Sequence, residues 1–481
     1  MPTKITTDLC IIGAGSGGLS VAAGAAQLGV DVVMIESHKT GGDCLNYGCV
    51  PSKALIAAAH IAHDQAHGGR FGVKDHTPEV DMAGVRDHIK SVIGAIEPHD
   101  SPARFEELGC KVILAKGSFK SPRVIVAGDY EIHFRYAVVS VGSSANIPPI
   151  PGLDSVPFLT NETIFDVGET IRELVVVGGG PIGSEMAQAH ARLGAKVRLI
   201  DFGKVLPRDD QECIEYVRES MRKDGVIFHQ STKTQSVEYD PATGYKITIA
   251  DRDGGNEEVL TPSHLLIATG RKPNIDGLNL EAAGIKFDRP GITVDARLRS
   301  VSNKRVFAIG DCAGGYQFTH VAGYHAGLVV RNALFAAPTK ADYKAVPWCT
   351  YTDPEIAHVG MNEDMATKAL GADGFTVARW SFEENDRAQA ERATNGLVKV
   401  IVDKRSRIRG ATIVGKHAGE LITPWVMATQ MQLKMIEMTK FIIPYPTLSE
   451  VTKRVAGSYF TPALFAPRTR KIVSFLKRLP F

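Results

Sequence analysis

Residues 8–36 read DLCIIGAGSGGLSVAAGAAQLGVDVVMIE, and residues 173–201 read ELVVVGGGPIGSEMAQAHARLGAKVRLID. The two stretches align without a gap. Each contains an apolar strand, a glycine-rich turn, an amphipathic helix and a second apolar strand that ends in a carboxylate. This order is that of a βαβ unit that binds a dinucleotide. A lone GxGxxG motif is weak evidence, but two complete copies predict an α/β protein with two Rossmann-like nucleotide-binding domains.

The glycines of each copy have distinct roles. The first permits a tight turn, the second lets the backbone approach a pyrophosphate, and the third lets the helix pack closely on the strand. They are Gly13, Gly15 and Gly18 in the first copy and Gly178, Gly180 and Gly183 in the second. Glu36 and Asp201 follow the third glycine by 18 residues, where a carboxylate can accept hydrogen bonds from a ribose diol.

The composition is that of an ordinary globular protein, with 44% hydrophobic residues, 22% charged residues and a net charge of +2 over 481 residues. A charge so close to zero argues against a nucleic-acid partner. The sequence contains neither a secretory signal nor an apolar run of about 20 residues that could cross a bilayer. Seven scattered cysteines with one close pair are not a secreted disulfide framework. We therefore expect a cytoplasmic enzyme.

The rest of the chain divides around the two copies. A buried-type strand followed by glycine closes each one, AVVSVGS at 137–143 and LLIATGR at 265–271. Another such strand, RVFAIGD at 305–311, returns to the first domain, and mixed strands and helices begin near Val346. The predicted domains are residues 1–152 with 275–345, residues 153–274, an α+β domain at 346–467 and a basic amphipathic tail at 468–481.

The most specific local feature is GGDCLNYGCVPSKAL at residues 41–55. Cys44 and Cys49 are five residues apart, which on an ideal helix separates their Cα atoms by roughly 8.6 Å. A disulfide needs about 4.4–6.8 Å, so the pair must lie where the chain is still turning into a helix, at Gly48 and Pro51. Cys49 is then near a helix N-terminus, where the dipole favours a thiolate. The alternatives are two inert cysteines or half a zinc site, but the other cysteines are too isolated to complete one.

This segment resembles the CxNxGCVPSK signature of the pyridine nucleotide–disulfide oxidoreductases, and most of all that of dihydrolipoamide dehydrogenases and mercuric reductases. The resemblance continues through IATGRKPN at 267–274, AIGD at 308–311 and YTDPEIAHVG at 351–360. It implies a homodimer with an FAD domain in two chain segments, an NAD domain inserted between them and a C-terminal α+β dimerisation domain.

The resemblance also implies residue roles. Cys44 resembles the interchange thiol that meets the substrate, and Cys49 resembles the thiol that faces the flavin. Lys53 resembles the lysine beside flavin N5, held by Glu185, since a cation there stabilises reduced flavin. The FAD-binding assignments are Gly13, Gly15, Gly18, Glu36, Gly42, Lys53, Gly117, Gly142, Asp311 and Thr319. The NAD-binding assignments are Gly178, Gly180, Gly183, Glu185, Asp201 and Gly270.

Asp201 also bears on the choice of nicotinamide cofactor. NADPH-specific relatives carry arginines near this position that hold the 2′-phosphate. Here the stretch is LIDFGKVLP, with an acid and only Lys204 nearby. An anion facing a phosphate is unfavourable, so the sequence predicts NADH rather than NADPH.

One motif departs from the family. In relatives that handle dithiols, the histidine of HPTxxE is the general base. The matching stretch here is PYPTLSE, which keeps Glu450 but has Tyr445 at the histidine position, both to be supplied by the partner subunit. A phenol with a pKa of about 10 is a poor base at neutral pH. Either the change is tolerated with slow dithiol chemistry, or, as we prefer, the acceptor needs no imidazole: a quinone, a metal ion, oxygen or an unusual disulfide.

The sequence thus predicts electron transfer from NADH through FAD to the Cys44–Cys49 disulfide, and on to a small-molecule or small-disulfide acceptor. The resemblance does not extend to a mercuric reductase proper, because that activity resembles a hand-off from a C-terminal cysteine pair and no cysteine follows Cys349 here. Two alternatives stay open. Electrons could leave at the level of the flavin, as in a quinone reductase or a transhydrogenase, or the cysteine pair could be a non-enzymatic redox sensor.

Two weaker features remain. His60, His63 and His67 have helical spacing, i, i+3 and i+7, but similar histidines follow the cysteine helix in the family, and no metal site is predicted. The tail RTRKIVSFLKRLPF places Ile472 and Leu476 with Leu479 on one helical face, among arginines and lysines. Such a helix is a candidate for peripheral contact with an anionic membrane, with packing on the dimer as the alternative.

Overall fold

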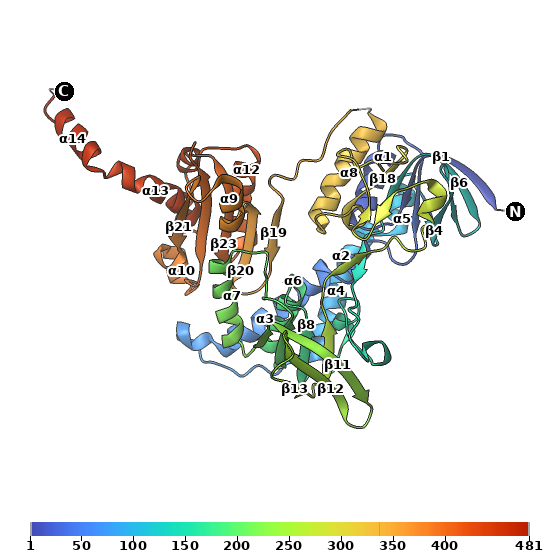
Figure 1. Ribbon diagram of the computed structural model, residues 1–481, viewed down its shortest axis with the longest axis horizontal. Helices are drawn as coiled ribbons and strands as arrows, with labels where there is room; N and C mark the ends of the chain where they lie inside the picture. Colours follow the sequence, from blue (N-terminus) through green and yellow to red (C-terminus); the bar gives the residue numbers. More distant parts are fainter. Residues whose placement is uncertain (1, 336, 480–481) are drawn as a thin grey trace. The chain divides into compact units, whose positions relative to one another are not determined.

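The computed structural model describes residues 2–335 and 337–479 (Figure 1). Its contacts divide the chain into two compact units. One comprises Met1–Val205 and Ile227–Ala341, and the other comprises Leu206–Val226 and Asp342–Phe481. The first unit contains both copies of the glycine motif. Residues 206–226 fall inside the predicted second nucleotide domain, yet their contacts group them with the C-terminal unit; the predicted domain boundaries remain predictions.

The first sheet of the larger unit is built around β1. This strand lies parallel to β2 and to β6, and β6 is also parallel to β18. The path runs β3-β2-β1-β6-β5-β4, with the last two strands antiparallel to their neighbours. Its strands are β1 (Thr3–Ile12), β2 (Val32–Glu36), β3 (Lys111–Leu114), β4 (Gly117–Ser121), β5 (Val124–Ala127), β6 (Tyr130–Val139) and β18 (Val306–Ala308).

Both faces of this sheet are covered where its central strands end, which explains why residues 9–12 of β1 and 137–139 of β6 are apolar and buried at every position rather than at alternate ones. Leu9 and Ile11 of β1 pack with helices α1 (Ser16–Ala26) and α8 (Thr319–Leu334). Cys10 and Ile12 point the other way, into a core shared with β4 and β5.

A second parallel sheet has the order β10-β9-β8-β14, and β11-β12-β13 form an antiparallel sheet beside its core. The parallel strands are β8 (Glu173–Val177), β9 (Lys196–Asp201), β10 (Ile227–Gln230) and β14 (His264–Ile267). The antiparallel strands are β11 (Thr232–Asp240), β12 (Gly244–Asp251) and β13 (Glu258–Leu260). Helix α6 (Pro181–Arg192) follows β8, with proline at the start, where its missing N–H costs nothing.

Four further helices and two pairs of short strands belong to this unit. They are α2 (Gly42–Asn46), α3 (Cys49–Ala66), α4 (Met82–Asp100), α5 (Pro102–Glu107) and the paired strands β7 (Ser143–Ala145) with β15 (Arg271–Pro273) and β16 (Phe287–Asp288) with β17 (Gly291–Ile292).

The second unit is an antiparallel sheet of order β19-β20-β23-β22-β21 with helices around it. Its strands are β19 (Pro347–Thr350), β20 (Glu355–Gly360), β21 (Phe375–Ser381), β22 (Leu397–Asp403) and β23 (Ile408–Gly415). Its helices are α7 (Gln211–Lys223), α9 (Glu363–Leu370), α10 (Asp386–Ala390), α11 (Ala418–Leu421), α12 (Thr423–Gln430), α13 (Glu450–Leu464) and α14 (Pro467–Leu476). Trp425 is fully buried in its core.

Polar contacts fasten α7 into this second unit. Asp210 caps the helix by accepting hydrogen bonds from Glu212 N and Cys213 N. The same carboxylate pairs with the ammonium group of Lys399 at 2.7 Å, and both side chains are almost fully buried, with 5% and 4% of their surface exposed. Burial alone would lower the pKa of Lys399, but its contacts with Asp210, Glu212 and Glu363 raise the pKa above the ordinary value. The predicted fold class, two Rossmann-like parts and a C-terminal α+β part, is confirmed.

Candidate active site

The first glycines of the two motifs occupy equivalent turns that only glycine fits. Gly13 has φ +102° and Gly178 has φ +114°, in the region that side chains disfavour. A Cβ atom at Gly13 would lie 2.5 Å from the carbonyl oxygen of Ser140. The same atom at Gly178 would lie 2.3 Å from the carbonyl oxygen of Ala268. Each βαβ turn therefore packs directly against the strand that closes its own domain.

The third glycines bring helices α1 and α6 close to these turns. A Cβ atom at Gly18 would overlap the oxygen of Gly13 at 1.9 Å, and one at Gly183 would overlap the oxygen of Gly178 at 1.8 Å. Among the described residues, no side chain caps the N-terminus of either helix. The first amides of α1 and α6 are thus available to an anion, and the residues fit the pyrophosphate of a dinucleotide at both turns.

The carboxylates at the ends of β2 and β9 fold back onto the glycine turns. Glu36 accepts hydrogen bonds from Ala14 N at 2.7 Å and His38 N at 2.8 Å. Asp201 accepts from Gly179 N at 2.7 Å and Gly203 N at 2.6 Å. Both carboxylates are therefore fixed beside the turn, in the position from which a ribose diol is held in this type of fold.

The cysteine pair lies across a break between two helices, as the spacing predicted. Cys44 is in α2, which ends at Asn46, and Cys49 is the first residue of α3. Gly48 is the N-cap of α3. The chain reverses between the helices, so the two thiols come within hydrogen-bonding contact, with Cys44 half-buried and Cys49 exposed.

The surroundings of the pair stabilise a thiolate on Cys49. The largest cause is the hydrogen bond from the Cys44 thiol, and the hydroxyl of Thr319, with Oγ1 3.6 Å from Sγ, and the charge of Lys53 act in the same direction. Burial and the carboxylate of Asp43 oppose them, and the net result lowers the pKa of Cys49 to about 6. The hydrogen bond to Cys49 and burial raise the pKa of Cys44. The pair thus has one thiolate and one neutral thiol at pH 7.

Lys53 lies one helical turn after Cys49 on α3 and reaches the second nucleotide-binding part. Its ammonium group is 2.8 Å from the Oε2 atom of Glu185 on α6. Glu185 is buried, with 5% of its surface exposed, whereas Lys53 is half-exposed. The predicted Lys53–Glu185 pair is therefore present, and it joins the cysteine helix to the helix of the second glycine motif.

A polar network beside the cysteines contains residues that the sequence did not single out. Arg271 lies 3.0 Å from the carboxylate of Asp43, donates to the backbone oxygen of Ser143 and lies 3.8 Å from Asp311. Burial raises the pKa of Asp311. The sequence does contain a signal for this network, because Asp43 is inside the cysteine motif and Arg271 ends the ATGR stretch.

His325 is a second residue that the sequence did not indicate. Its Nδ1 atom accepts a hydrogen bond from Gly310 N at 3.2 Å, immediately before Asp311. Burial lowers the pKa of His325 to about 4, so the ring is neutral at pH 7. It thereby fixes the turn that presents Asp311.

The other predicted cofactor glycines lie at turns around this site. Gly42, Gly142 and Gly270 all have positive φ, at +63°, +65° and +110°. A Cβ atom at Gly42 would lie 2.6 Å from the Cα atom of Gly15, so the cysteine motif starts against the first glycine turn. Gly117 is buried at the start of β4, where a Cβ atom would meet Ile35 and Ile12.

Tyr445 and Glu450 belong to the second unit. Glu450 is the first residue of α13, and Tyr445 lies in the loop before it with 69% of its surface exposed. The Tyr445 hydroxyl donates to Asp386 Oδ2 at 3.1 Å, and this contact raises the pKa of the phenol. Tyr445 is thus an even weaker acid than an ordinary tyrosine, and its phenol stays protonated at neutral pH. That a partner subunit supplies these residues to the cysteine pair remains a prediction.

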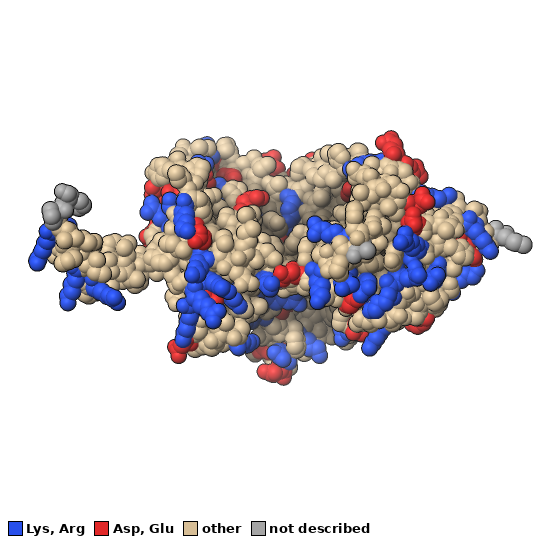
Figure 2. Space-filling view, turned by 90° about the horizontal axis from the view of Figure 1, so that it is seen from above, with Lys and Arg blue, Asp and Glu red and all other residues tan. Residues whose placement is uncertain are grey.

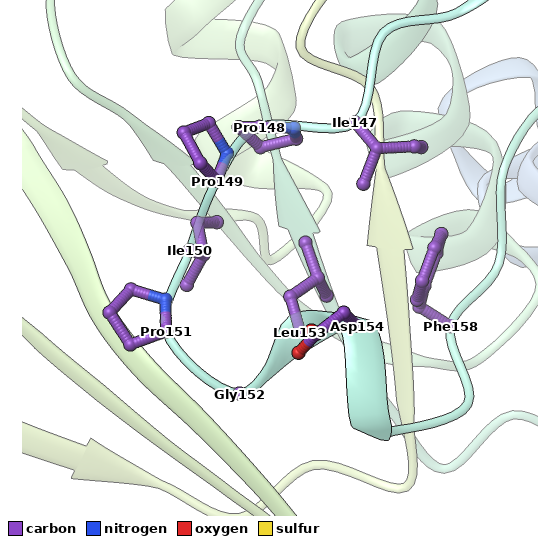
Figure 3. A pocket seen from close by; sticks show the side chains of 9 residues that line it. All are labelled: Ile147, Pro148, Pro149, Ile150, Pro151, Gly152, Leu153, Asp154 and Phe158. Carbon is purple, nitrogen blue, oxygen red and sulfur yellow. The ribbon is translucent and has the colours of Figure 1, made fainter.

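Other candidate sites are less well equipped. The rings of His63 and His67 stack at 4.2 Å, and no group of three or more His, Cys, Asp or Glu among residues 2–335 and 337–479 could hold a metal ion. A cavity of about 720 Å³ is lined by residues 147–154 and Phe158 (Figure 3). Its one ionisable side chain is that of Asp154, so its lining offers no pair of groups for acid–base or redox chemistry.

The comparisons with known proteins agree with this geometry. A model of the family described as pyridine nucleotide-disulphide oxidoreductase matches residues 7–326, and a model of its dimerisation domain matches residues 346–456. A mercuric reductase of Streptomyces lividans is 34% identical over 460 residues, which cover 94% of this chain and 96% of the relative. A dihydrolipoyl dehydrogenase of Halobacterium salinarum is 35% identical over 468 residues, covering 94% and 95%.

Solved structures give the same result. The HOCl-induced flavoprotein disulfide reductase RclA of Escherichia coli, in a complex with Cu(II), superposes with a TM-score of 0.83 at 25% identity. The match covers 93% of this chain and 99% of that one.

Proposed function

The chain belongs to the pyridine nucleotide-disulphide oxidoreductase family, and from this premise we propose that it carries electrons from NADH through FAD to the Cys44–Cys49 pair. Members of this family are oxidoreductases that act on sulfur groups and bind FAD and a pyridine nucleotide. The observation that carries the proposal is the thiol pair itself. It spans a helix break, its thiolate is stabilised at Cys49, and its helix is joined to the second glycine motif through Lys53 and Glu185.

We assign the first glycine turn with Glu36 to FAD and the second with Asp201 to NADH. FAD, when bound, supplies the redox chemistry by accepting hydride from the nicotinamide and returning the electron pair to a disulfide. Lys53 is assigned to the flavin edge, where its charge favours the reduced cofactor and Glu185 holds the ammonium group in place.

The two cysteines have different roles in this transfer. On reduction the S–S bond breaks, Cys49 keeps the negative charge, and Cys44 takes up a proton. When the acceptor is a disulfide, the sulfur of Cys44 attacks it and the acceptor's S–S bond breaks. The proton of the Cys44 thiol goes to the departing sulfur, which leaves as the first thiol. Cys49 then displaces the second thiol and re-forms the Cys44–Cys49 bond. The dimerisation domain supports a homodimer, in which Tyr445 and Glu450 of one subunit face the cysteines of the other.

An anaerobic titration with NADH tests the proposal. The protein as purified is expected to contain bound FAD and to develop long-wavelength absorption from a thiolate beside the flavin. A protein without bound FAD, or a titration in which this absorption never forms, would remove the basis for the role of Cys49.

A metal ion is the second candidate for the acceptor. The relatives include mercuric reductases, and the structural neighbour was solved with Cu(II). A thiolate–thiol pair is a soft ligand set suited to such ions, and it needs no imidazole base. Hg(II) and Cu(II) should therefore be tested as electron acceptors together with quinones, oxygen and disulfides.

Tyr445→His is expected to raise dihydrolipoamide turnover at neutral pH by about tenfold or more, because imidazole titrates near neutrality and the phenol does not. The measurement is kcat with NAD and dihydrolipoamide from pH 6 to 9. Tyr445→Phe is the matched control and is expected to leave turnover of the preferred acceptor unchanged. A large loss in Tyr445→Phe would mean that the phenol itself is catalytic.

NADH is expected to exceed NADPH in kcat/KM by about tenfold or more, since the Asp201 carboxylate repels a 2′-phosphate. Asp201→Asn keeps the size of the side chain and removes the charge. The ratio of kcat/KM for NADH to kcat/KM for NADPH should therefore fall by about tenfold. Glu173→Gln, at the start of β8, is a control for the loss of one carboxylate. An unchanged ratio in Asp201→Asn would exclude Asp201 as the source of the preference.

A further inference from the structure

The chain continues beyond the matched dimerisation domain into a basic helix that the proposed function does not use. The family match ends at residue 456, and α14 begins at Pro467. Helix α13 packs on the sheet of the second unit with its first turns, and Figure 1 shows its end and α14 extending away from that sheet. None of the residues of α14 is buried. Its side chains are therefore available to something outside the second unit.

Four exposed apolar side chains of this segment form one stripe, and a fifth, Val473, lies beside it. Ile472, Phe475, Leu476 and Leu479 follow the spacing i, i+3, i+4, i+7, which places them on one face of a helix. They are 49%, 63%, 50% and 48% exposed. Apolar side chains this exposed and this regularly spaced mark a binding face rather than scattered surface residues.

Basic residues surround the apolar stripe. By helical spacing Arg470 and Lys477 lie across the helix from it, Lys471 and Arg478 flank it beside Phe475, and Arg468 lies near its N-terminal end. All five are exposed. Figure 2 shows these cationic side chains along the tail. No acidic residue follows Glu450 in the sequence. The chain's +2 less the tail's +5 leaves −3 for the rest of the protein, so the positive charge is concentrated at this helix.

We propose that residues 467–479 dock the enzyme onto the surface of an anionic lipid bilayer, with the helix lying in the plane of the interface. The apolar stripe enters the boundary between headgroups and acyl chains, and the basic residues contact the lipid phosphates. No helix in the described part of the chain is long and apolar enough to cross a membrane. The contact is therefore peripheral. Pro480 and Phe481, which end the predicted tail, lie outside the described residues.

Charge favours a lipid surface over a second copy of the same helix. Two copies of α14 that pair through their apolar stripes would bring together the five cations of each tail, which costs free energy. An anionic bilayer satisfies the apolar and basic faces at the same time. Membrane docking does not depend on the identity of the electron acceptor, so a negative result for the docking would leave the proposed function unaffected, and the reverse also holds.

The test is co-sedimentation of the full-length holoenzyme with large vesicles. We expect binding to vesicles of phosphatidylcholine mixed with phosphatidylglycerol, little binding to phosphatidylcholine alone, and release by added salt. Reversing the charges of four tail residues should weaken the partition by about tenfold or more. The four are Arg470, Lys471, Lys477 and Arg478, each changed to Glu. The matched control reverses four exposed basic residues elsewhere, namely Lys74, Lys286, Arg289 and Lys340.

A second measurement reports on the apolar stripe directly. Phe475→Trp places a fluorophore in it, and its emission is expected to shift to the blue with anionic vesicles only. If the tail variant and the control lose vesicle binding equally, the net charge of the protein accounts for the binding, and the proposal is overturned. Failure of the unmodified protein to bind anionic vesicles would overturn it as well. If the tail variant instead changes the monomer–dimer equilibrium in sedimentation velocity while vesicle binding persists, α14 packs on the second subunit and the proposal is wrong.

Discussion

A Cys44→Ser protein is expected to retain its bound flavin and to lose at least about 1,000-fold of its NADH-dependent disulfide reduction, because serine cannot form the S–S bond through which the electrons leave. The measurement is the steady-state reduction of a small aromatic disulfide with NADH as donor. Reduction of ferricyanide or a quinone by the same variant should persist, since electrons can reach these acceptors without a thiol. The ratio of the two rates therefore reports on the cysteine pathway alone.

The control for this experiment is Cys349→Ser, a half-buried cysteine in the second unit, which is expected to leave both rates unchanged. The Cys44→Ser variant also reports on the ionisation of Cys49. In the unmodified protein the pKa of Cys49 is lowered to about 6, with the hydrogen bond from the Cys44 thiol as the largest cause. Without that thiol, the thiolate of Cys49 should be lost at a higher pH in the variant than in the unmodified protein. Undiminished disulfide reduction by Cys44→Ser would favour transfer at the level of the flavin.

Gly13→Ala and Gly178→Ala are expected to separate the two cofactor sites, each with a cost of about 3 kcal/mol or more at its own turn. Both positions combine a positive φ with a Cβ atom that would lie within 2.5 Å of a carbonyl oxygen. Gly13→Ala should therefore yield protein that lacks flavin. Gly178→Ala should keep its flavin yet require more than about 100-fold more NADH for half-maximal reduction, which is the same cost expressed as an affinity.

The measurements are the flavin-to-protein absorbance ratio and the NADH dependence of flavin reduction. Gly94→Ala is the matched control, because this glycine lies inside α4 and an added methyl group there would have nothing within 4 Å of its carbon. If Gly178→Ala loses flavin as readily as Gly13→Ala, the two turns do not serve separate cofactors.

The sequence was most informative where a structural requirement is local. A tight turn needs glycine at Gly13 and Gly178, and two thiols five residues apart can meet only across a break in a helix. Both features appear in the structure as expected. The chain carries the relevant residues within a few positions of one another, so their spacing alone limits the geometry.

Contacts between distant residues were not predictable in the same way. Arg271 forms an ion pair with Asp43, although the residues of the second nucleotide-binding part lie between them in the sequence. His325, on α8, accepts a hydrogen bond from Gly310, which lies in a turn before that helix. Neither pair shares a motif, and their approach depends on how whole strands are ordered. The grouping of residues 206–226 with the C-terminal unit is of this kind too, since it rests on side chains such as Asp210 and Lys399 that lie 189 positions apart.

The Asp210–Lys399 pair implies that the C-terminal unit cannot be moved into another protein as a separate folded domain. A fragment cut at the start of the matched dimerisation domain would keep Lys399 but discard Asp210 and Glu212. Of the three carboxylates that contact the ammonium group, the fragment would retain that of Glu363 alone. Removing partners from a buried ion pair destabilises a fold by about 3–5 kcal/mol, which is a large part of what holds a domain of this size together. Any recombination between relatives that preserves folding must therefore exchange α7 and the C-terminal residues together, although most of a nucleotide-binding domain separates them along the gene.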